Sequence, residues 1–163
     1  MVIVPDTSYS KNLLDFAKQL SEKYKDVCYV SLNKPYGHLI KSFEDHKIDK
    51  NFFFFIDAVT RPSNPVKKEN YIFISSISAL TDLSIAITKT LETRKYKSII
   101  FDSLSTMLIY HEAATVTKFM HSLIGEVRAV KCIGVFTCLE GDVKSSLIKD
   151  LGMFVDEVVK IKK

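Results

Sequence analysis

The sequence predicts a three-layer α/β/α sandwich with a mainly parallel central sheet. Short apolar runs alternate with amphipathic segments along almost the whole chain, which is the pattern of strands joined by right-handed helical crossovers. The run Ser98–Asp102 is continuously apolar until it ends in a carboxylate, as is typical of a strand covered on both faces. At 163 residues the chain has the length of one domain with a buried core, so we expect a single domain over residues 1–163.

The first third of the chain contains two amphipathic segments between three apolar runs. We expect a short strand at residues 2–4 and a helix over residues 10–24, where apolar side chains recur at helical spacing. We expect the second strand over the apolar run at residues 27–32. The following segment begins with a proline, which suits the first turn of a helix over residues 35–46. Residues 52–56 are short and intensely apolar, which indicates a buried strand.

The middle of the chain holds the one segment that is rich in proline and polar residues. Residues 58–70 are expected to form an exposed loop, too short to separate two domains. A strand at residues 71–74 follows. Ser76 or Ser78 is then expected to cap a helix that ends near Arg94.

The last third repeats the alternation. The remaining expected elements are a strand over residues 98–102, a connecting segment through Tyr110, a helix around residues 116–127, a strand over residues 131–137, a short helix over residues 142–151 and a final strand over residues 155–161.

The cysteines and the N-terminal residues indicate a cytoplasmic protein. Cys28, Cys132 and Cys138 lie in apolar runs without Cys-x-x-Cys spacing, so we expect reduced, buried thiols and no metal site. The first residues carry no basic region and no long apolar stretch, which argues against a signal peptide. The apolar runs are also too short for membrane insertion.

The charge of the chain is only weakly basic. The formal net charge is +4, and lysines in the proline-rich loop and at the C-terminal end supply much of the excess. No arginine-rich helix, aromatic RNA platform or zinc-finger spacing is present. The composition therefore disfavours nucleic acid as a partner.

Three strand ends are expected to meet at one edge of the sheet: the loop after Val4, the loop after Leu32 and the end of the strand at Asp102. Open parallel sheets bind ligands at this edge. Nucleoside-triphosphatases hold Mg²⁺ there through water bound to an aspartate, which makes Asp102 a candidate for indirect contact with magnesium. A second role stays open, in which Asp102 caps the next segment together with Ser103 and Ser105.

The first loop aligns with the phosphate-loop pattern Gly-x-x-x-x-Gly-Lys-[Ser/Thr]. Pro5 stands at the first glycine, Ser10 at the last, Lys11 at the lysine and Asn12 at the magnesium-binding hydroxyl. Together with the order of the later strands, this register resembles the RecA superfamily of P-loop NTPases, and within it the KaiC-like ATPase domains common in archaea. The resemblance covers nearly the whole chain and implies a RecA-like topology and a nucleotide site.

The chain departs from that family at three catalytic positions. None of its five glycines lies in the first loop, although glycines are what let such a loop turn its amides toward phosphate. Asn12 is a weak magnesium ligand. At the end of the second strand the family's glutamate is replaced by Asn33 and Lys34, neither of which is a general base at neutral pH. The resemblance, with these losses, implies a pseudo-ATPase.

Three functions follow from this pattern. The first is a non-catalytic regulatory or scaffold domain, of the kind used in signalling, which works through a protein partner or self-association and needs no cofactor. Tyr71, Ile77 and Ile85 are candidate contact residues for it. The second is a module that binds a nucleotide such as ATP with magnesium, or another phosphate ligand, without hydrolysing it. The third, a weak ATPase, lacks a base.

The nucleotide-binding alternative makes its own prediction of site residues. The residues that would contact the ligand are Thr7, Ser8, Ser10, Lys11 and Asp102.

Overall fold

The computed structural model describes residues 1–60, 70–94 and 96–162. Within these residues seven strands form one sheet in the order β4-β3-β2-β5-β6-β1-β7, and every pairing is parallel. The strands are β1 (Val2–Val4), β2 (Val27–Ser31), β3 (Phe53–Asp57), β4 (Tyr71–Phe73), β5 (Ser98–Asp102), β6 (Ile133–Leu139) and β7 (Val159–Lys160). Because all strands run the same way, their carboxyl ends lie at one edge of the sheet.

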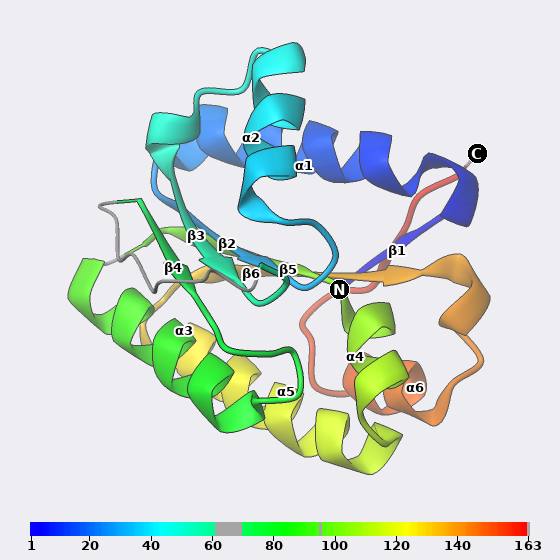
Figure 1. Ribbon diagram of the computed structural model, residues 1–163. Helices are drawn as coiled ribbons and strands as arrows, with labels where there is room; N and C mark the ends of the chain where they lie inside the picture. Colours follow the sequence, from blue (N-terminus) through cyan, green and yellow to red (C-terminus); the bar gives the residue numbers. More distant parts are fainter. Residues whose placement is uncertain (61–69, 95, 163) are drawn as a thin grey trace.

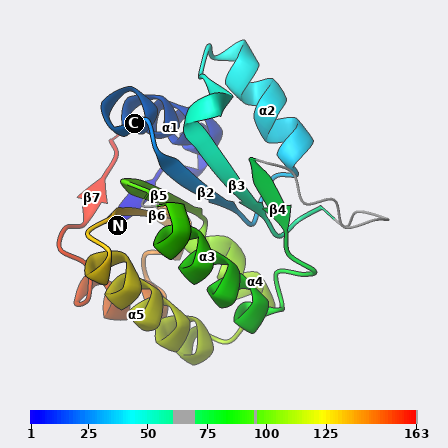
Figure 2. The same ribbon diagram turned by 90° about the vertical axis from the view of Figure 1, so that its left-hand side faces the viewer.

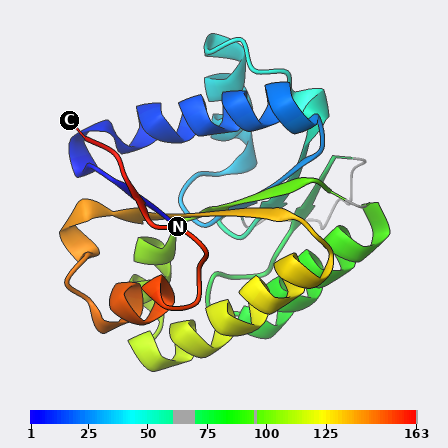
Figure 3. The ribbon, with the colours of Figure 1, turned by 180° about the vertical axis from the view of Figure 1, so that it is seen from behind.

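Helices cover both faces of the sheet, as the predicted sandwich requires. The α-helices are α1 (Tyr9–Tyr24), α2 (Tyr36–Asp45), α3 (Leu80–Arg94), α4 (Leu104–Tyr110), α5 (Ala113–Ala129) and α6 (Ser146–Gly152), and the 3₁₀ turns are η1 (Asp6–Ser8), η2 (Lys50–Phe52) and η3 (Glu140–Asp142). Helices α1 and α2 lie on one face, and α3 to α6 lie on the other (Figure 1). The same layers are visible from the side and from behind (Figures 2 and 3).

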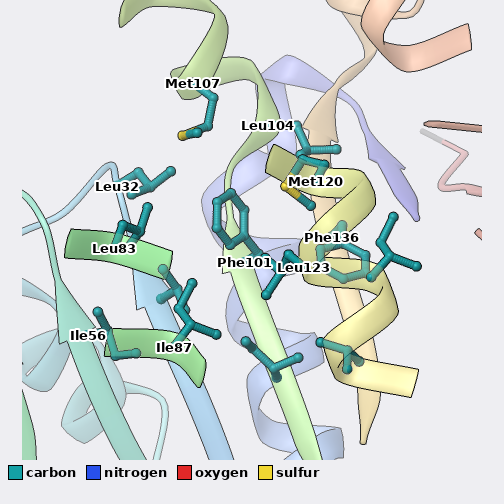
Figure 4. Close-up of a cluster of buried hydrophobic side chains, with 14 of the residues drawn as sticks. Leu32, Ile56, Leu83, Ile87, Phe101, Leu104, Met107, Met120, Leu123 and Phe136 are labelled. Carbon is teal, nitrogen blue, oxygen red and sulfur yellow. The ribbon is translucent and has the colours of Figure 1, made fainter. Parts of the chain in front are cut away.

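Each layer of helices has its own hydrophobic core. Side chains of α1 and α2 form one cluster with side chains of β2 and β3, and side chains of α3, α5 and α6 belong to a larger cluster on the other face of the sheet. Figure 4 shows the larger core, where the fully buried ring of Phe101 lies among aliphatic side chains from several elements. Gly134 in β6 is part of this packing, because a Cβ there would come within 2.6 Å of the ring of Phe136.

Residues 104–110 form a helix, where the sequence pattern predicted only a connecting segment. The Ser103 side chain accepts a hydrogen bond from the Thr106 backbone N–H, which satisfies one of the free donors at the start of α4. The helix buries Leu104 and Met107 against the sheet. The prediction was wrong because a helix of seven residues is too short to show a clear apolar period.

Four boundaries differ from the expected ones for local reasons. Helix α6 begins only at Ser146, because the Ser145 hydroxyl caps it by accepting a hydrogen bond from the Ile148 N–H. Helix α3 begins at Leu80, since Ser76 caps a preceding turn through a hydrogen bond to the Ser78 N–H. Strand β6 is shifted toward the C-terminus because Lys131, with φ 56°, belongs to the turn that ends α5. The final strand is reduced to β7, as the residues directly after α6 continue its last turn. Residues 61–69 of the predicted loop lie outside the described residues.

The three cysteines are buried and free, as expected. Burial raises the pKa of Cys132 to about 12 and that of Cys138 to about 11, and it raises the pKa of Cys28 further still. In the described part of the chain, histidine, cysteine and acidic side chains do not form a group of three that could hold a metal. Nor does that part contain a helix with the length and apolar character needed to cross a bilayer.

These thiols are expected to resist alkylation in the folded protein. Iodoacetamide reacts with thiolates, and a raised thiol pKa leaves almost no thiolate at pH 8. Mass spectrometry should therefore find the native protein unlabelled after a time in which the urea-unfolded protein gains three labels, one for each cysteine. Rapid labelling of the native protein at one site would show that the site opens to solvent.

Candidate functional site

A cleft of about 620 Å³ lies at the carboxyl ends of the central strands. It is bordered by the start of α1, the β2–α2 loop, the β5–α4 junction and the end of β6. Its lining residues are Tyr9, Ser10, Asn33, Lys34, Asp102, Ser103, Ser105, Thr106, Leu108, Ile109, Leu139 and Asp142. This is the edge at which the sequence predicted a site, and the volume is in the range of small-molecule pockets.

Asp102 lies at the base of the cleft, and its carboxylate is hydrogen-bonded on both oxygens. The Tyr9 hydroxyl and the Asn33 side-chain amide donate to Oδ1, each at 2.6 Å. The Tyr29 hydroxyl donates to Oδ2 at 3.0 Å. The residue has no exposed surface. Three donors from this chain therefore occupy most of the positions at which the carboxylate could bind water or a cation.

Burial changes the acid–base properties of this group. Desolvation raises the pKa of Asp102, and hydrogen bonds from Tyr9, Asn33 and Tyr29 oppose that rise. The pKa values of Tyr9 and Tyr29 are raised far above the usual range, chiefly by burial and then by the charge of Asp102. Both phenols therefore keep their protons at neutral pH and remain hydrogen-bond donors.

A further polar contact connects this carboxylate to β6. The Thr137 hydroxyl lies 2.7 Å from the Tyr9 hydroxyl and 3.1 Å from the carbonyl oxygen of Phe101. Thr137 is fully buried. The side chain of Tyr9 is thus held from two neighbouring strands, which places it across the end of β5.

The N-terminal end of α4 forms the adjacent wall of the cleft. The Thr106 hydroxyl donates to the side-chain oxygen of Asn33, whose amide nitrogen lies 3.3 Å from the Ser103 hydroxyl. Ser105 accepts a hydrogen bond from the backbone N–H of Leu139 at 2.8 Å. Both serine hydroxyls therefore form hydrogen bonds within the protein. Ser103 caps α4, and Ser105 connects α4 to β6.

The first loop is a single 3₁₀ turn. Pro5 has an extended conformation, and η1 connects it directly to α1. Positive φ values at non-glycine residues occur, within the described residues, at Lys25, Lys47 and Lys131. The loop therefore has none of the left-handed residues with which an anion nest is built. At its end, the Asn12 side chain donates to the hydroxyl and the carbonyl of Ser8, so this amide serves the helix start.

The structure separates the five predicted nucleotide-binding residues. Ser10 and Asp102 line the cleft. Thr7 and Lys11 are exposed and do not line it, and neither does Ser8. The assignment of these five residues to a nucleotide site stays a prediction.

Lys34 supplies a positive charge to the cleft that the predicted site did not include. Its backbone is fixed by Ser31, whose buried hydroxyl contacts both the N–H and the carbonyl of Lys34. Its ammonium group donates to the Ser10 hydroxyl at 3.1 Å. The same charge acts on Asp102, whose pKa it lowers slightly against the effect of burial.

Asp57, at the end of β3, is a second buried acid at the same edge of the sheet, but it has a structural role. One oxygen accepts from the backbone N–H groups of Val59 and Thr60, and the other accepts from the Tyr36 N–H at the start of α2. An acid at a helix N-terminus is favoured by the helix dipole. These bonds hold the chain as it leaves β3.

Sequence patterns did not identify Tyr9, Tyr29 or Thr106 as part of the site. Tyr29 lies in the middle of an apolar strand, where its ring is indistinguishable from core packing. Its hydroxyl reaches Asp102 only because β2 and β5 are neighbours in register. The one available signal for Tyr9 was its position within the stretch that aligns with the phosphate-loop pattern.

Comparison with known families gives an assignment without a function. Residues 46–161 match a family of unknown function, DUF7504. The chain belongs to this family. No curated protein matches the sequence.

Comparison with solved structures identifies the fold. The crystal structure of a KaiC-like protein from the hyperthermophilic archaeon Pyrococcus horikoshii OT3 superposes with a TM-score of 0.68 over 99% of this chain and 72% of that chain, at 12% sequence identity. At this identity the likeness shows the fold alone. The predicted RecA-like α/β topology is therefore confirmed for this member of the family.

Proposed function

We propose that this protein is a non-catalytic RecA/KaiC-like domain that acts as a regulatory or scaffold protein through protein contacts. The observation that carries the proposal is that Tyr9, Tyr29 and Asn33 occupy most of the acceptor positions of the Asp102 carboxylate. A catalytic magnesium site needs a carboxylate that can bind the metal's water shell. Here the Tyr9 hydroxyl of the same chain donates to that carboxylate.

The shape of the first loop supports the same conclusion. Phosphoryl transfer depends almost entirely on positioning and charge neutralisation of the phosphates. A 3₁₀ turn offers no ring of inward amides, and Lys11 lies outside the cleft. Asn33 and Lys34 stand where KaiC-like ATPase domains have a glutamate. The Asn33 side chain is hydrogen-bonded to Asp102, and the Lys34 side chain is hydrogen-bonded to Ser10.

Exposed apolar side chains beside the cleft support the contact role. Ile109 is 77% exposed and Tyr110 is 51% exposed, both at the end of α4. Of the candidate contact residues predicted from sequence, Ile85 is exposed on α3, whereas Tyr71 and Ile77 are buried. The prediction for those two was wrong because their side chains pack into the two cores.

The purified protein is expected to hydrolyse no ATP above the rate of a no-protein control. Phosphate release should be measured with magnesium at millimolar ATP, in parallel with calorimetric titration of Mg-ATP and Mg-ADP. Saturable heat without hydrolysis, lost in Lys11→Ala and Ser10→Ala, would favour the nucleotide-binding alternative. Hydrolysis that disappears in Tyr9→Phe or Asp102→Asn would contradict the proposal.

The proposed role in protein–protein contacts needs a separate measurement. Light scattering should report the molar mass over a range of concentrations, and affinity capture should use the full chain as bait. A strict monomer that recovers no partner would contradict a scaffold role, even if ATP hydrolysis were absent.

A further inference from the structure

The cleft contains one lysine, Lys34, whose ammonium group forms no ion pair with an acid in the described part of the chain. Its ammonium group has three protons, and the contact with Ser10 uses one of them. Lys34 is half-buried as a residue, and an ammonium group with unused donors at its end can bind an anion.

The acids around the cleft limit how much negative charge a ligand can carry. Asp102 lies at the base, and Asp142 lines the rim at the end of β6. Against these two carboxylates the lining offers a single lysine. A polyphosphate would bring several negative charges into a cleft with one cation, and like charges at short range repel. A ligand with one negative group, placed at Lys34, meets less of this repulsion than a polyphosphate does.

Apolar side chains form the rest of the lining. The apolar wall of the cleft consists of Leu108, Ile109 and Leu139. Ile109 is largely exposed in this structure, which leaves apolar surface available to a ligand. The cleft therefore combines one cationic point with an adjacent surface that favours an apolar group.

We infer that this cleft binds a small organic molecule with one negatively charged group and an apolar body. The negatively charged group of this ligand lies at the Lys34 ammonium and the Ser10 hydroxyl, and its apolar body lies against the apolar wall. The inference rests on the proposed function, because an enzyme that hydrolyses ATP would use this cleft for the triphosphate. It adds the chemical class of ligand that such a non-catalytic domain would sense.

Anilinonaphthalene sulfonate is a suitable probe, since it carries one sulfonate on an apolar aromatic body and fluoresces when it leaves water. We expect saturable binding of one molecule per chain. Lys34→Met should weaken binding about tenfold or more, because it removes the charge and keeps the length of the side chain. Lys34→Arg should retain binding.

Lys18→Met is the matched control, since Lys18 is an exposed lysine on α1 that does not line the cleft. It should bind the probe like the unmodified protein. Asp142→Asn should strengthen binding about twofold to threefold by removing a like charge from the rim. Thermal melting of each variant establishes that it is folded.

Binding that Lys34→Met and Lys18→Met leave equally strong would overturn the inference, and so would a weaker affinity in Asp142→Asn. Absence of saturable binding would do the same. None of these outcomes touches the proposed lack of catalysis, which depends on phosphate release from ATP. Conversely, an active ATPase would remove the proposed function while the affinity for the probe could still be measured.

Discussion

Replacement of Asp102 by alanine is expected to lower the free energy of unfolding by about 2–4 kcal/mol. The substitution removes the acceptor of three side-chain donors at once. Tyr9 and Asn33 can turn toward water in the cleft. Tyr29 cannot, because its residue is only 1% exposed, so its hydroxyl would stay buried without a partner. Urea unfolding followed by circular dichroism measures the change.

Two variants separate this effect from a general loss of charge. Asp15→Ala removes an exposed acid on α1 and should change stability by less than about 0.5 kcal/mol. Asp102→Asn keeps one acceptor oxygen and the shape of the side chain, so its loss should be smaller than that of alanine. A cost for Asp102→Ala no greater than for Asp15→Ala would show that the polar network contributes little.

The pH dependence of the same comparison has a definite sign. Because burial raises the pKa of Asp102, the folded protein holds this proton more tightly than the unfolded chain does. The stability from this linkage is complete below the unfolded pKa and is lost as pH rises through the folded pKa. Asp102→Asn lacks the linkage. Its stability relative to the unmodified protein should therefore increase as pH rises from the acid range.

Phe101→Ala is expected to cost more, about 3–5 kcal/mol. The ring of Phe101 is fully buried in the larger core, near Phe136 (Figure 4). It also lies against the ring of Phe119. Neighbours on a rigid parallel sheet cannot move far enough to fill the space that the ring leaves, so most of the cavity would remain.

Phe16→Ala provides the control, because Phe16 is only half-buried on α1 and belongs to neither core cluster. It should cost less than half as much as Phe101→Ala in the same urea titration. Equal losses for the two variants would indicate that the core around β5 collapses readily into the vacated volume.

The amino-acid sequence alone was sufficient to predict the succession of the strands and the longer helices along the chain, because strands buried on both faces appear in the sequence as apolar runs. Strand β5 has the predicted bounds, residues 98–102. Asp102 lies, as expected, at the edge of the sheet formed by the carboxyl ends of the strands. Short elements show no recognisable apolar pattern in the sequence. Helix α4 was missed, and the final strand was overestimated, since two residues cannot display a period.

What surrounds Asp102 was decided by tertiary structure. Tyr9, Tyr29 and Asn33 are 93, 73 and 69 residues away from it in the chain, and no local pattern relates them. The sequence determined that glycines are missing from the first loop and that an acid ends the central strand. Only the pairing of β2 with β5, and the position of the first residue of α1 at the strand ends, brings two phenols and an amide onto that acid. Hydrogen bonds between distant residues depend on this placement, whereas hydrophobic periodicity does not.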